Sequence, residues 1–350
     1  MIKPRKAVEE MEAYVPPLEG RRGLLRLDFN ENTIGCSPKV LSAVRNITGE
    51  EIASYPEYGR FKARLADFLK VKPGQVMITN ATDEAIMVLM KAYIDKGDEV
   101  ILPVPTFAMF KFYAQIREAK ITEILYEEDF RFPAKQVLNA INKKTRLVVL
   151  CNPNNPTGSL IDRKDIISIT EKALENNSLV LVDEAYYQYS KAECLDLVER
   201  YDNLVIIRTF SKAYGMGGLR LGYAVSNKEI IKNLLKVCSP YSVNVVSMAA
   251  AKAAMEDTDF VKSYVKEVKR AKKIIYEEMD KLKIKTYPTS ANFLIAKFPK
   301  RAKEVEEKLR EKGILVRNRS SDIMLKDCIR IGIGTVRQTR ELVNALKEIM

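Results

Sequence analysis

The sequence predicts an α/β fold: a three-layer large domain with a mostly parallel sheet, followed by a smaller α/β domain. Between about residues 75 and 225, short apolar runs alternate with helical patterns, which is typical of a parallel sheet covered by helices on both faces. Past residue 240 the pattern changes to long amphipathic stretches with fewer apolar runs. This change indicates a second, smaller unit.

Six apolar runs are the predicted strands of the large sheet. Several are continuous rather than alternating, as expected for strands buried on both faces. The runs are Gln75–Thr79, Glu99–Pro103, Leu147–Cys151, Leu179–Val182, Leu204–Arg208 and Leu221–Ala224. Helical patterns such as Asp83–Ile94 and Arg163–Asn176 lie between them.

The ends of the chain complete the predicted organisation. The smaller unit is predicted to contain an amphipathic helix over 261–282, then Ala291–Phe298 (strand), Ala302–Glu311 (helix), Ile329–Ile333 (strand) and Thr339–Ile349 (helix). Residues 1–37 are rich in turn formers and carry one short strand at Leu24–Phe29, so they cannot bury a core alone. We therefore expect an N-terminal segment (1–37) packed on the small domain and a partner subunit, a large cofactor-binding domain (38–239) and a small C-terminal domain (240–350).

Composition narrows the chemistry and the location. The 350 residues include no histidine, which excludes a Ser-His-Asp triad and His-ligated zinc. The five cysteines are scattered, with no C-x-x-C, so we expect no metal site and a reducing cytoplasm. With neither a signal peptide nor an 18-residue apolar run, no membrane association is expected. Catalysis must therefore use Lys, Asp, Glu, Tyr, Cys or a cofactor.

The charge balance is basic, with 58 Lys and Arg against 46 Asp and Glu, a net charge of +12. A basic protein can bind nucleic acid or small anions. The two signs interleave along the chain, however, and basic and aromatic residues do not cluster. A solvated surface explains this pattern, and we expect no nucleic-acid partner.

Lys212 differs from the other lysines in its neighbours. It follows an apolar strand and precedes a glycine-rich run ending at Arg220, and the carboxyl edge of a parallel strand is where α/β sheets bind ligands. The hydroxyls of Thr209 and Ser211 and the Arg220 guanidinium suit a phosphate. An amine beside a phosphate site, without histidine, suggests a Schiff-base lysine with pyridoxal 5′-phosphate. An ordinary glycine-rich loop is the alternative.

Three further segments support a cofactor site. Asp183 ends an apolar strand, where a buried carboxylate needs a cation such as a pyridinium nitrogen, unless it is a helix N-cap. Asn152-Pro-Asn-Asn155-Pro-Thr-Gly158 follows another strand, and turn formation does not explain three asparagines there. Thr82 and Asp83 stand where a strand turns into a helix, which makes a ready phosphate site or a plain N-cap.

These motifs, in the order Asn-Pro-Asn-Asn-Pro-Thr-Gly, Asp-Glu-Ala-Tyr and Thr-Phe-Ser-Lys-Ala-Tyr-Gly-Met-Gly-Gly-Leu-Arg, resemble the fold-type-I (class II) pyridoxal-phosphate aminotransferases. Among these the chain is most similar to the histidinol-phosphate aminotransferases. The likeness runs from Tyr14-Val-Pro-Pro to Cys328-Ile-Arg-Ile-Gly, nearly the whole chain. The motifs are highly specific for the fold, cofactor and chemistry of the family, and less specific for the substrate.

The resemblance implies roles for the cofactor residues. Lys212 would form the Schiff base and shuttle the proton, Asp183 would pair with the pyridine nitrogen, and Tyr186 and Asn155 would hydrogen-bond the ring 3′-oxygen. Phe107 stands where the family usually has a tyrosine, so the stacking face remains without its hydroxyl. The phosphate would be held by Thr82, Asp83, Thr209, Ser211 and Arg220.

The resemblance also implies a homodimer and a substrate. Tyr55 resembles the tyrosine that reaches the neighbouring subunit's cofactor, so the active site would be shared between subunits. Arg330 matches the family's substrate-anion arginine. The other implied substrate residues are Tyr14, Asn30, Tyr55 and Arg317. Two arginines and a tyrosine suit a dianionic phosphate better than one carboxylate.

The expected function is transamination of L-histidinol phosphate with 2-oxoglutarate, a step of histidine biosynthesis, giving imidazole-acetol phosphate and L-glutamate by a ping-pong mechanism. Three alternatives stay open. An aromatic or broad-specificity aminotransferase would share every cofactor residue, and a threonine-phosphate decarboxylase would also need a phosphate pocket. A cofactor-binding regulator would need a DNA-binding domain, and no helix-turn-helix extension precedes residue 30.

Overall fold

A computed structural model describes residues 2–13, 15–190 and 192–350. Its largest element is a seven-stranded sheet in the order β2-β8-β7-β6-β5-β3-β4, with β8 antiparallel to both neighbours and the other pairings parallel. The strands are β2 (Val76–Thr79), β3 (Glu99–Val104), β4 (Lys120–Leu125), β5 (Thr145–Cys151), β6 (Leu179–Asp183), β7 (Leu204–Thr209) and β8 (Gly222–Val225). All six predicted strands of the large sheet are confirmed.

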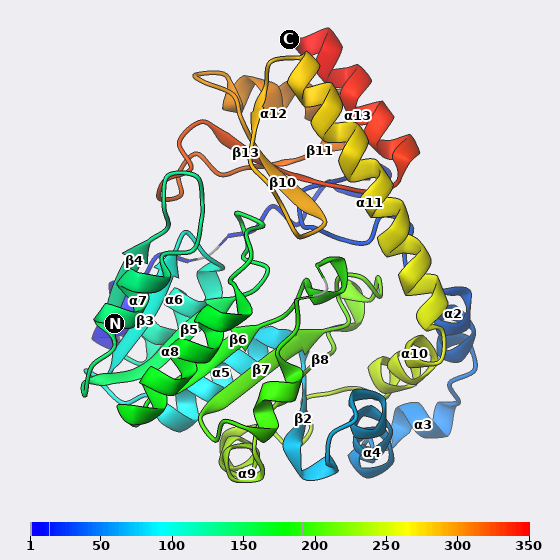
Figure 1. The fold of residues 1–350 in the computed structure, drawn as a ribbon. Helices are drawn as coiled ribbons and strands as arrows, with labels where there is room; N and C mark the ends of the chain where they lie inside the picture. The colour runs from blue at the N-terminus through cyan, green and yellow to red at the C-terminus, as the bar shows by residue number, and fades with distance from the viewer. Residues whose placement is uncertain (1, 14, 191) are drawn as a thin grey trace.

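The sheet has a helical layer on each face (Figure 1). Alternate strand residues belong to different cores: Val148 and Leu150 pack in one, Leu147 and Val149 in the other. Five helices follow strands of this sheet: α5 (Ala81–Tyr93), α6 (Ala108–Ile116), α7 (Ala134–Ala140), α8 (Arg163–Glu175) and α9 (Lys228–Val237). Because both faces are buried, the strands read as continuous apolar runs, and the predicted three-layer arrangement is confirmed.

The edge strand β4 is absent from the sequence-based expectation. Its residues Lys120-Ile-Thr-Glu-Ile-Leu125 are all exposed or half-buried, and none is buried. Such a strand shows no apolar run, because it pairs with β3 on one side only.

A second sheet lies above the first in Figure 1. It is four-stranded and antiparallel, in the order β12-β13-β10-β9. Its strands are β9 (Lys285–Thr286), β10 (Phe293–Lys297), β12 (Arg317–Asn318) and β13 (Cys328–Gly332), and its helices are α11 (Thr258–Lys281), α12 (Ala302–Glu311) and α13 (Val336–Ile349). The four elements predicted beyond residue 290 are therefore present with boundaries within a few residues.

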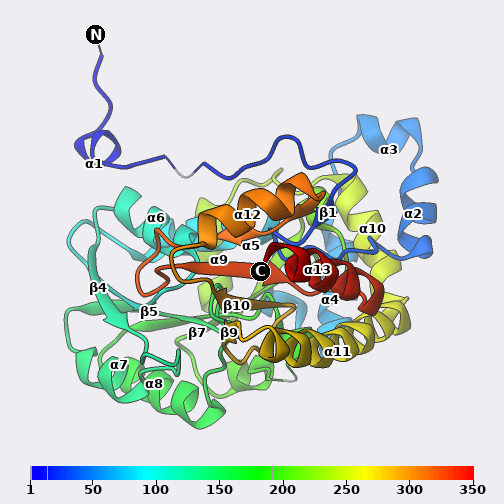
Figure 2. The same cartoon turned by 90° about the horizontal axis from the view of Figure 1, so that it is seen from above.

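The N-terminal segment joins the two sheets. β1 (Leu25–Arg26) pairs in parallel with β11 (Ile314–Leu315), and the Gly332 amide donates to the Leu27 carbonyl at 2.7 Å. Short helices flank it: α1 (Lys6–Glu9) beside α6 at the edge of the molecule (Figure 2), then α2 (Pro38–Arg45), α3 (Gly49–Ala53) and α4 (Tyr58–Leu69). The remaining helix, α10 (Val245–Met255), packs against α2 and α4. The chain past residue 240 therefore first returns to the side of the large sheet.

Short 3-10 turns complete the described structure. They cover Pro73–Gln75, Tyr187–Tyr189, Leu195–Glu199 and Gly217–Leu219. Within the described ranges, no helix is both long and apolar enough to cross a membrane.

Gly332 is the tightest contact between β13 and the N-terminal segment. A Cβ atom there would lie 3.0 Å from both the Cα and the carbonyl oxygen of Leu27. We expect Gly332→Ala to lower the free energy of unfolding by about 1–3 kcal/mol, because backbone atoms on both sides must move. Thermal or urea unfolding measures the change. Gly59→Ala in α4 is the control, since no atom lies within 4 Å of its Cβ position, and equal effects of the two substitutions would contradict this account.

Candidate active site

The candidate site is a cavity of about 610 Å³ at the carboxyl ends of β6 and β7, closed from above by the N-terminal segment and β13. Most residues that the sequence singled out line it. They are Asn30, Thr82, Asp83, Phe107, Asn155, Asp183, Tyr186, Thr209, Ser211, Lys212, Arg220 and Arg330. Segments far apart in the sequence therefore meet around one space.

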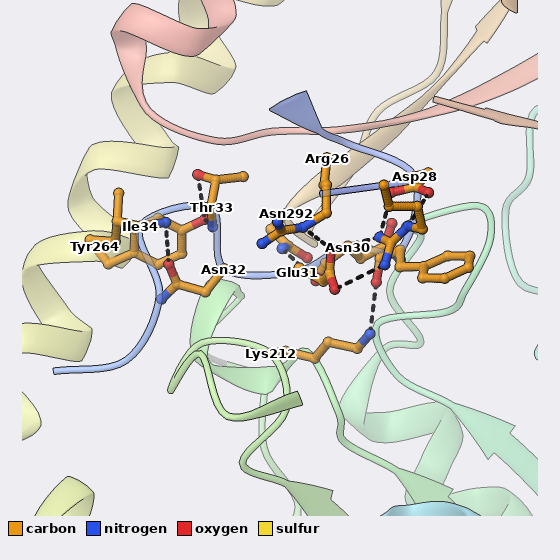
Figure 3. A network of polar contacts seen from close by, with 12 residues as sticks. Arg26, Asp28, Asn30, Glu31, Asn32, Thr33, Ile34, Lys212, Tyr264 and Asn292 are labelled. Carbon is orange, nitrogen blue, oxygen red and sulfur yellow. Dashed lines mark hydrogen bonds and ion pairs between the residues drawn. The ribbon is translucent and has the colours of Figure 1, made fainter. Parts of the chain in front are cut away.

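Lys212 projects into this cavity from the loop after β7. Its Nζ donates a hydrogen bond to the Phe29 carbonyl at 2.9 Å (Figure 3). The same Nζ lies 5.6 Å from the centroid of the Tyr186 ring. Burial, and then the charge of Arg330, lowers the pKa of Lys212 to about 8. A substantial fraction of this amine is consequently neutral and nucleophilic near physiological pH.

Asp183 ends β6 and is only 3% exposed. One carboxylate oxygen accepts a hydrogen bond from the Ala185 amide at 2.9 Å. Among the described residues it has no ion-pair partner within 4 Å, and burial raises its pKa to about 7. A carboxylate held this way favours a cationic or N–H partner within the cavity.

The amino end of α5 provides an anion site beside Lys212. The helix starts at Ala81, and the Asn80 side chain does not cap it, so its first N–H groups are available to a ligand. Gly222 brings β8 against this start, because a Cβ atom there would lie 2.8 Å from the Ala81 carbonyl carbon. Ala81, Thr82 and Asp83 line the cavity, so the start of the helix faces it.

Two hydroxyls and a guanidinium lie at the same end of the cavity. The Thr209 hydroxyl donates to the Ser211 hydroxyl at 2.9 Å and accepts from the Ser211 amide at 3.0 Å. Arg220 forms a 2.7 Å ion pair with Asp83, from a backbone conformation with φ of 54°. Hydroxyls, helix N–H groups and a guanidinium together suit a phosphate group.

Arg330 ties the upper wall of the cavity to the lower one. Its guanidinium donates to Asn155 Oδ1 at 2.5 Å and to the Asp28 carbonyl at 2.6 Å, and the residue is 6% exposed. The Tyr186 hydroxyl accepts from the Asn30 side-chain amide at 3.0 Å. The predicted residues Asn30, Asn155, Tyr186 and Arg330 thus form one connected wall.

The N-terminal segment is held over the cavity by its own polar contacts (Figure 3). The Asn292 side-chain amide donates to the Asn30 carbonyl at 3.1 Å, and that of Asn32 donates to the Ala213 carbonyl at 2.9 Å. Arg21 pairs with Asp28 at 2.8 Å and with Glu31 at 2.7 Å. These contacts fix the Phe29 carbonyl that receives Lys212.

Two of the predicted site residues are not among those that line the described cavity, and a third is not described by the structure. Tyr55 is 78% exposed and stacks on Tyr241 with ring centroids 4.8 Å apart, and it does not line the cavity as described. Arg317 lies opposite Arg330 in the β12–β13 ladder but is also not part of the described lining. Tyr14 falls outside the described residues.

Sequence reasoning missed Arg21 and Arg319, which both line the cavity. The Arg319 side chain is 12% exposed and pairs with Asp322, and its Nε has no hydrogen-bond partner among the described residues. The only sequence signal for Arg319 was its position two residues after Arg317, because Arg319 itself lies just past the two-residue strand β12. Arg21 stands in a turn-rich stretch and carries no such signal.

Comparison with known proteins identifies the family to which this chain is similar. The sequence model of the family "Aminotransferase class I and II" matches residues 22–346. Histidinol-phosphate aminotransferase 2 of Carboxydothermus hydrogenoformans is 36% identical over 99% of both chains. The histidinol-phosphate aminotransferase of Caldanaerobacter subterraneus subsp. tengcongensis is 38% identical over 93% of each.

Solved structures share the fold. Histidinol-phosphate aminotransferase from Sinorhizobium meliloti, in complex with pyridoxal-5′-phosphate, superposes with a TM-score of 0.90 at 24% identity, covering 100% of this chain and 98% of that one. L-threonine-O-3-phosphate decarboxylase from Porphyromonas gingivalis reaches 0.81 at 22% identity, covering 93% and 99%. The match to the family over most of the chain, and the identity to its curated members, settle the assignment. The chain belongs to the class I and II aminotransferases, enzymes whose cofactor is pyridoxal 5′-phosphate.

Proposed function

We propose that this aminotransferase moves an amino group between L-histidinol phosphate and 2-oxoglutarate, as the names of its relatives suggest. The observation that carries the proposal is the grouping of cations in one cavity. Arg21, Arg319 and Arg330 line it together with Lys212 and Arg220. After one phosphate site is assigned to the cofactor, arginines remain for a second, substrate-borne anion.

The residues present fit the cofactor at both of its polar ends. Asp183 would offer a desolvated carboxylate to the pyridine nitrogen, and Tyr186 with Asn155 would hydrogen-bond the ring oxygen. Thr209, Ser211, Arg220 and the amides of Thr82 and Asp83 would hold the phosphate, and Phe107 offers a ring face. When bound, pyridoxal phosphate supplies an aldehyde for amine exchange and a ring that accepts electrons.

The remaining steps belong to the protein. Lys212, whose lowered pKa leaves a fraction of the amine neutral, would take a proton from the substrate carbon that bears the amine and return it at the neighbouring position. Asp183 would keep the pyridine nitrogen protonated, while Arg330 would hold the substrate anion and orient that carbon toward Lys212. Tyr55 would complete the site of a second subunit in a homodimer.

A coupled assay tests the proposal directly. Purified protein supplied with pyridoxal phosphate, histidinol phosphate and 2-oxoglutarate should produce glutamate. Faster turnover of phenylalanine would favour an aromatic aminotransferase, and CO₂ release from threonine phosphate would favour a decarboxylase. Either result, without glutamate formation from histidinol phosphate, would overturn the assignment.

Lys212→Ala should lower turnover by about a hundredfold or more, because the amine both attacks and transfers the proton, and no histidine can replace it. The variant should still bind the cofactor, but without covalent attachment. Steady-state kinetics and absorbance measure the two properties. Lys272→Ala is the matched control, since burial also lowers the pKa of that lysine to about 8 but it does not line the described cavity. Lys212→Ala turnover within about tenfold of the unaltered enzyme would place the nucleophile elsewhere.

Asp183 should make cofactor-free stability depend on pH. Its folded-state pKa of about 7 lies above the ordinary 3.8, so its contribution is fully present below the lower value and is lost as pH rises through the higher one. Near pH 8, Asp183→Asn should therefore raise the free energy of unfolding by up to about 4 kcal/mol. The gain should vanish near pH 4, and cofactor affinity should fall at every pH. Denaturant unfolding at several pH values measures it, and a pH-independent difference would contradict the pKa.

Substitutions of the arginines should affect kcat/KM differently for phosphorylated and unphosphorylated substrates. Arg330→Ala should cost on the order of 3 kcal/mol in kcat/KM, the scale of a lost charge-assisted contact. Arg317 is predicted from the sequence to bind the substrate. Arg319 is a second candidate for that role, because it lines the cavity. We expect Arg319→Ala to lower kcat/KM for histidinol phosphate about tenfold more than for phenylalanine. Arg317→Ala is its matched comparison, and an effect confined to Arg317→Ala would return the role to that residue.

A further inference from the structure

Directly behind the cavity lies a buried ion pair that the proposed mechanism does not use. Glu184 follows Asp183, and Arg208 precedes Thr209. Asp183 and Thr209 line the cavity. Successive side chains of a strand point to opposite faces, and Glu184 and Arg208 accordingly stay out of the described lining. The pair therefore stands one residue from two cofactor contacts on neighbouring strands.

The pair is fully buried and closely bonded. Two nitrogens of Arg208 contact Glu184 Oε2, Nη2 at 2.7 Å and Nε at 2.8 Å, and the side chains are 3% and 0% exposed. The other oxygen of Glu184 accepts from the Cys194 amide at 2.5 Å. Arg208 also pairs with Glu193 at 3.0 Å. Both charges are consequently satisfied in a place with little water.

The same group reaches the segment that carries Lys212. The Arg208 guanidinium lies 3.8 Å from the centroid of the Tyr187 ring, next to Tyr186. Tyr187 and Tyr214 hydrogen-bond to each other. Tyr214 lies two residues after Lys212. One buried cluster therefore contacts the chain beside Asp183, Tyr186, Thr209 and Lys212.

The ladder of backbone hydrogen bonds between β6 and β7 ends beside the Glu184–Arg208 pair. Its last hydrogen bond joins the Glu184 amide to the Ile207 carbonyl at 2.9 Å. Beyond it the two chains diverge, and the Phe210 amide turns to the Leu221 carbonyl. The Glu184–Arg208 contact thus continues the link between the strands just where the ladder ends.

We infer that Glu184 and Arg208 are positioning residues, which set the spacing between the Asp183 carboxylate and the Thr209–Lys212 segment. The inference rests on the proposed function only in needing the cofactor, a single molecule whose ring nitrogen and phosphate would contact these two strand ends. Stability alone does not account for the pair, because well-packed apolar side chains commonly replace a buried ion pair without loss. A fixed spacing between strands does require directional bonds.

The test replaces both residues together. The double variant Glu184→Met with Arg208→Met removes both charges and keeps apolar volume, so it should unfold within a few degrees of the unaltered protein. Titration with pyridoxal phosphate, followed by absorbance, should show affinity weakened at least about tenfold, as expected when contacts are displaced. The pH at which the absorbance of the bound cofactor changes should also shift. An unchanged affinity and an unchanged pH midpoint would overturn the inference, whatever happens to stability.

Two further variants complete the design. Arg301→Met with Glu304→Met removes an ion pair, with a nitrogen–oxygen distance of 2.8 Å, at the start of α12, and should leave cofactor affinity and pH midpoint unchanged. If the Met double variant fails to fold, Arg208→Lys decides: it keeps the charge but loses the two-nitrogen contact, and should show the same shift. All readouts concern cofactor binding, so they stay valid even if histidinol phosphate proves not to be the substrate.

Discussion

The burial of an unpaired carboxylate at the end of β6 is the constraint on which the rest of the site depends. Asp183 is nearly inaccessible and has no ion-pair partner within 4 Å among the described residues, so its ionisation is costly until a ligand supplies a partner. The flanking strands keep it there, because β5 and β7 pair with β6 on both sides. Lys212 shows the complementary effect, since the same burial lowers the pKa of its amine. One cavity thus holds a buried carboxylate of raised pKa and an amine of lowered pKa, which is what the proposed contacts with a pyridine nitrogen and a carbonyl carbon would require.

One wall of that cavity is formed by segments that do not belong to the large sheet. Arg330 of β13 bonds the Asp28 carbonyl and Asn155, so the small sheet, the N-terminal segment and the loop after β5 converge on one guanidinium. The Phe29 carbonyl that receives Lys212 belongs to the same N-terminal segment. The glycine at 332, which lets β13 approach Leu27, is therefore as much a part of the site as the charged residues. Packing of the small sheet against the N-terminal segment therefore helps to position this wall of the cavity.

Much of this arrangement could be predicted, for reasons that also explain the gaps. Strands buried on both faces are readable as apolar runs, and polar residues at their carboxyl ends point to one edge, which located Asp183, Thr209 and Lys212. The edge strand β4 has no such run and was missed. The Phe29 carbonyl could not be foreseen, because a backbone contact leaves no residue signature. Arg319 was missed because the resemblance implied Arg317, and only the geometry of the chain after β12 brings Arg319 to the cavity.

Nitrogen-15 NMR of the enzyme loaded with cofactor labelled at the pyridine nitrogen tests the central claim most directly. If Asp183 is the buried partner of that nitrogen, the resonance should report a protonated nitrogen throughout the neutral pH range, and Asp183→Ala should shift it to the unprotonated position. Tyr186→Phe, which keeps the carboxylate, should leave it protonated. An unprotonated nitrogen in the unaltered enzyme at neutral pH would contradict the account, because the buried carboxylate would then have no cation to justify its place.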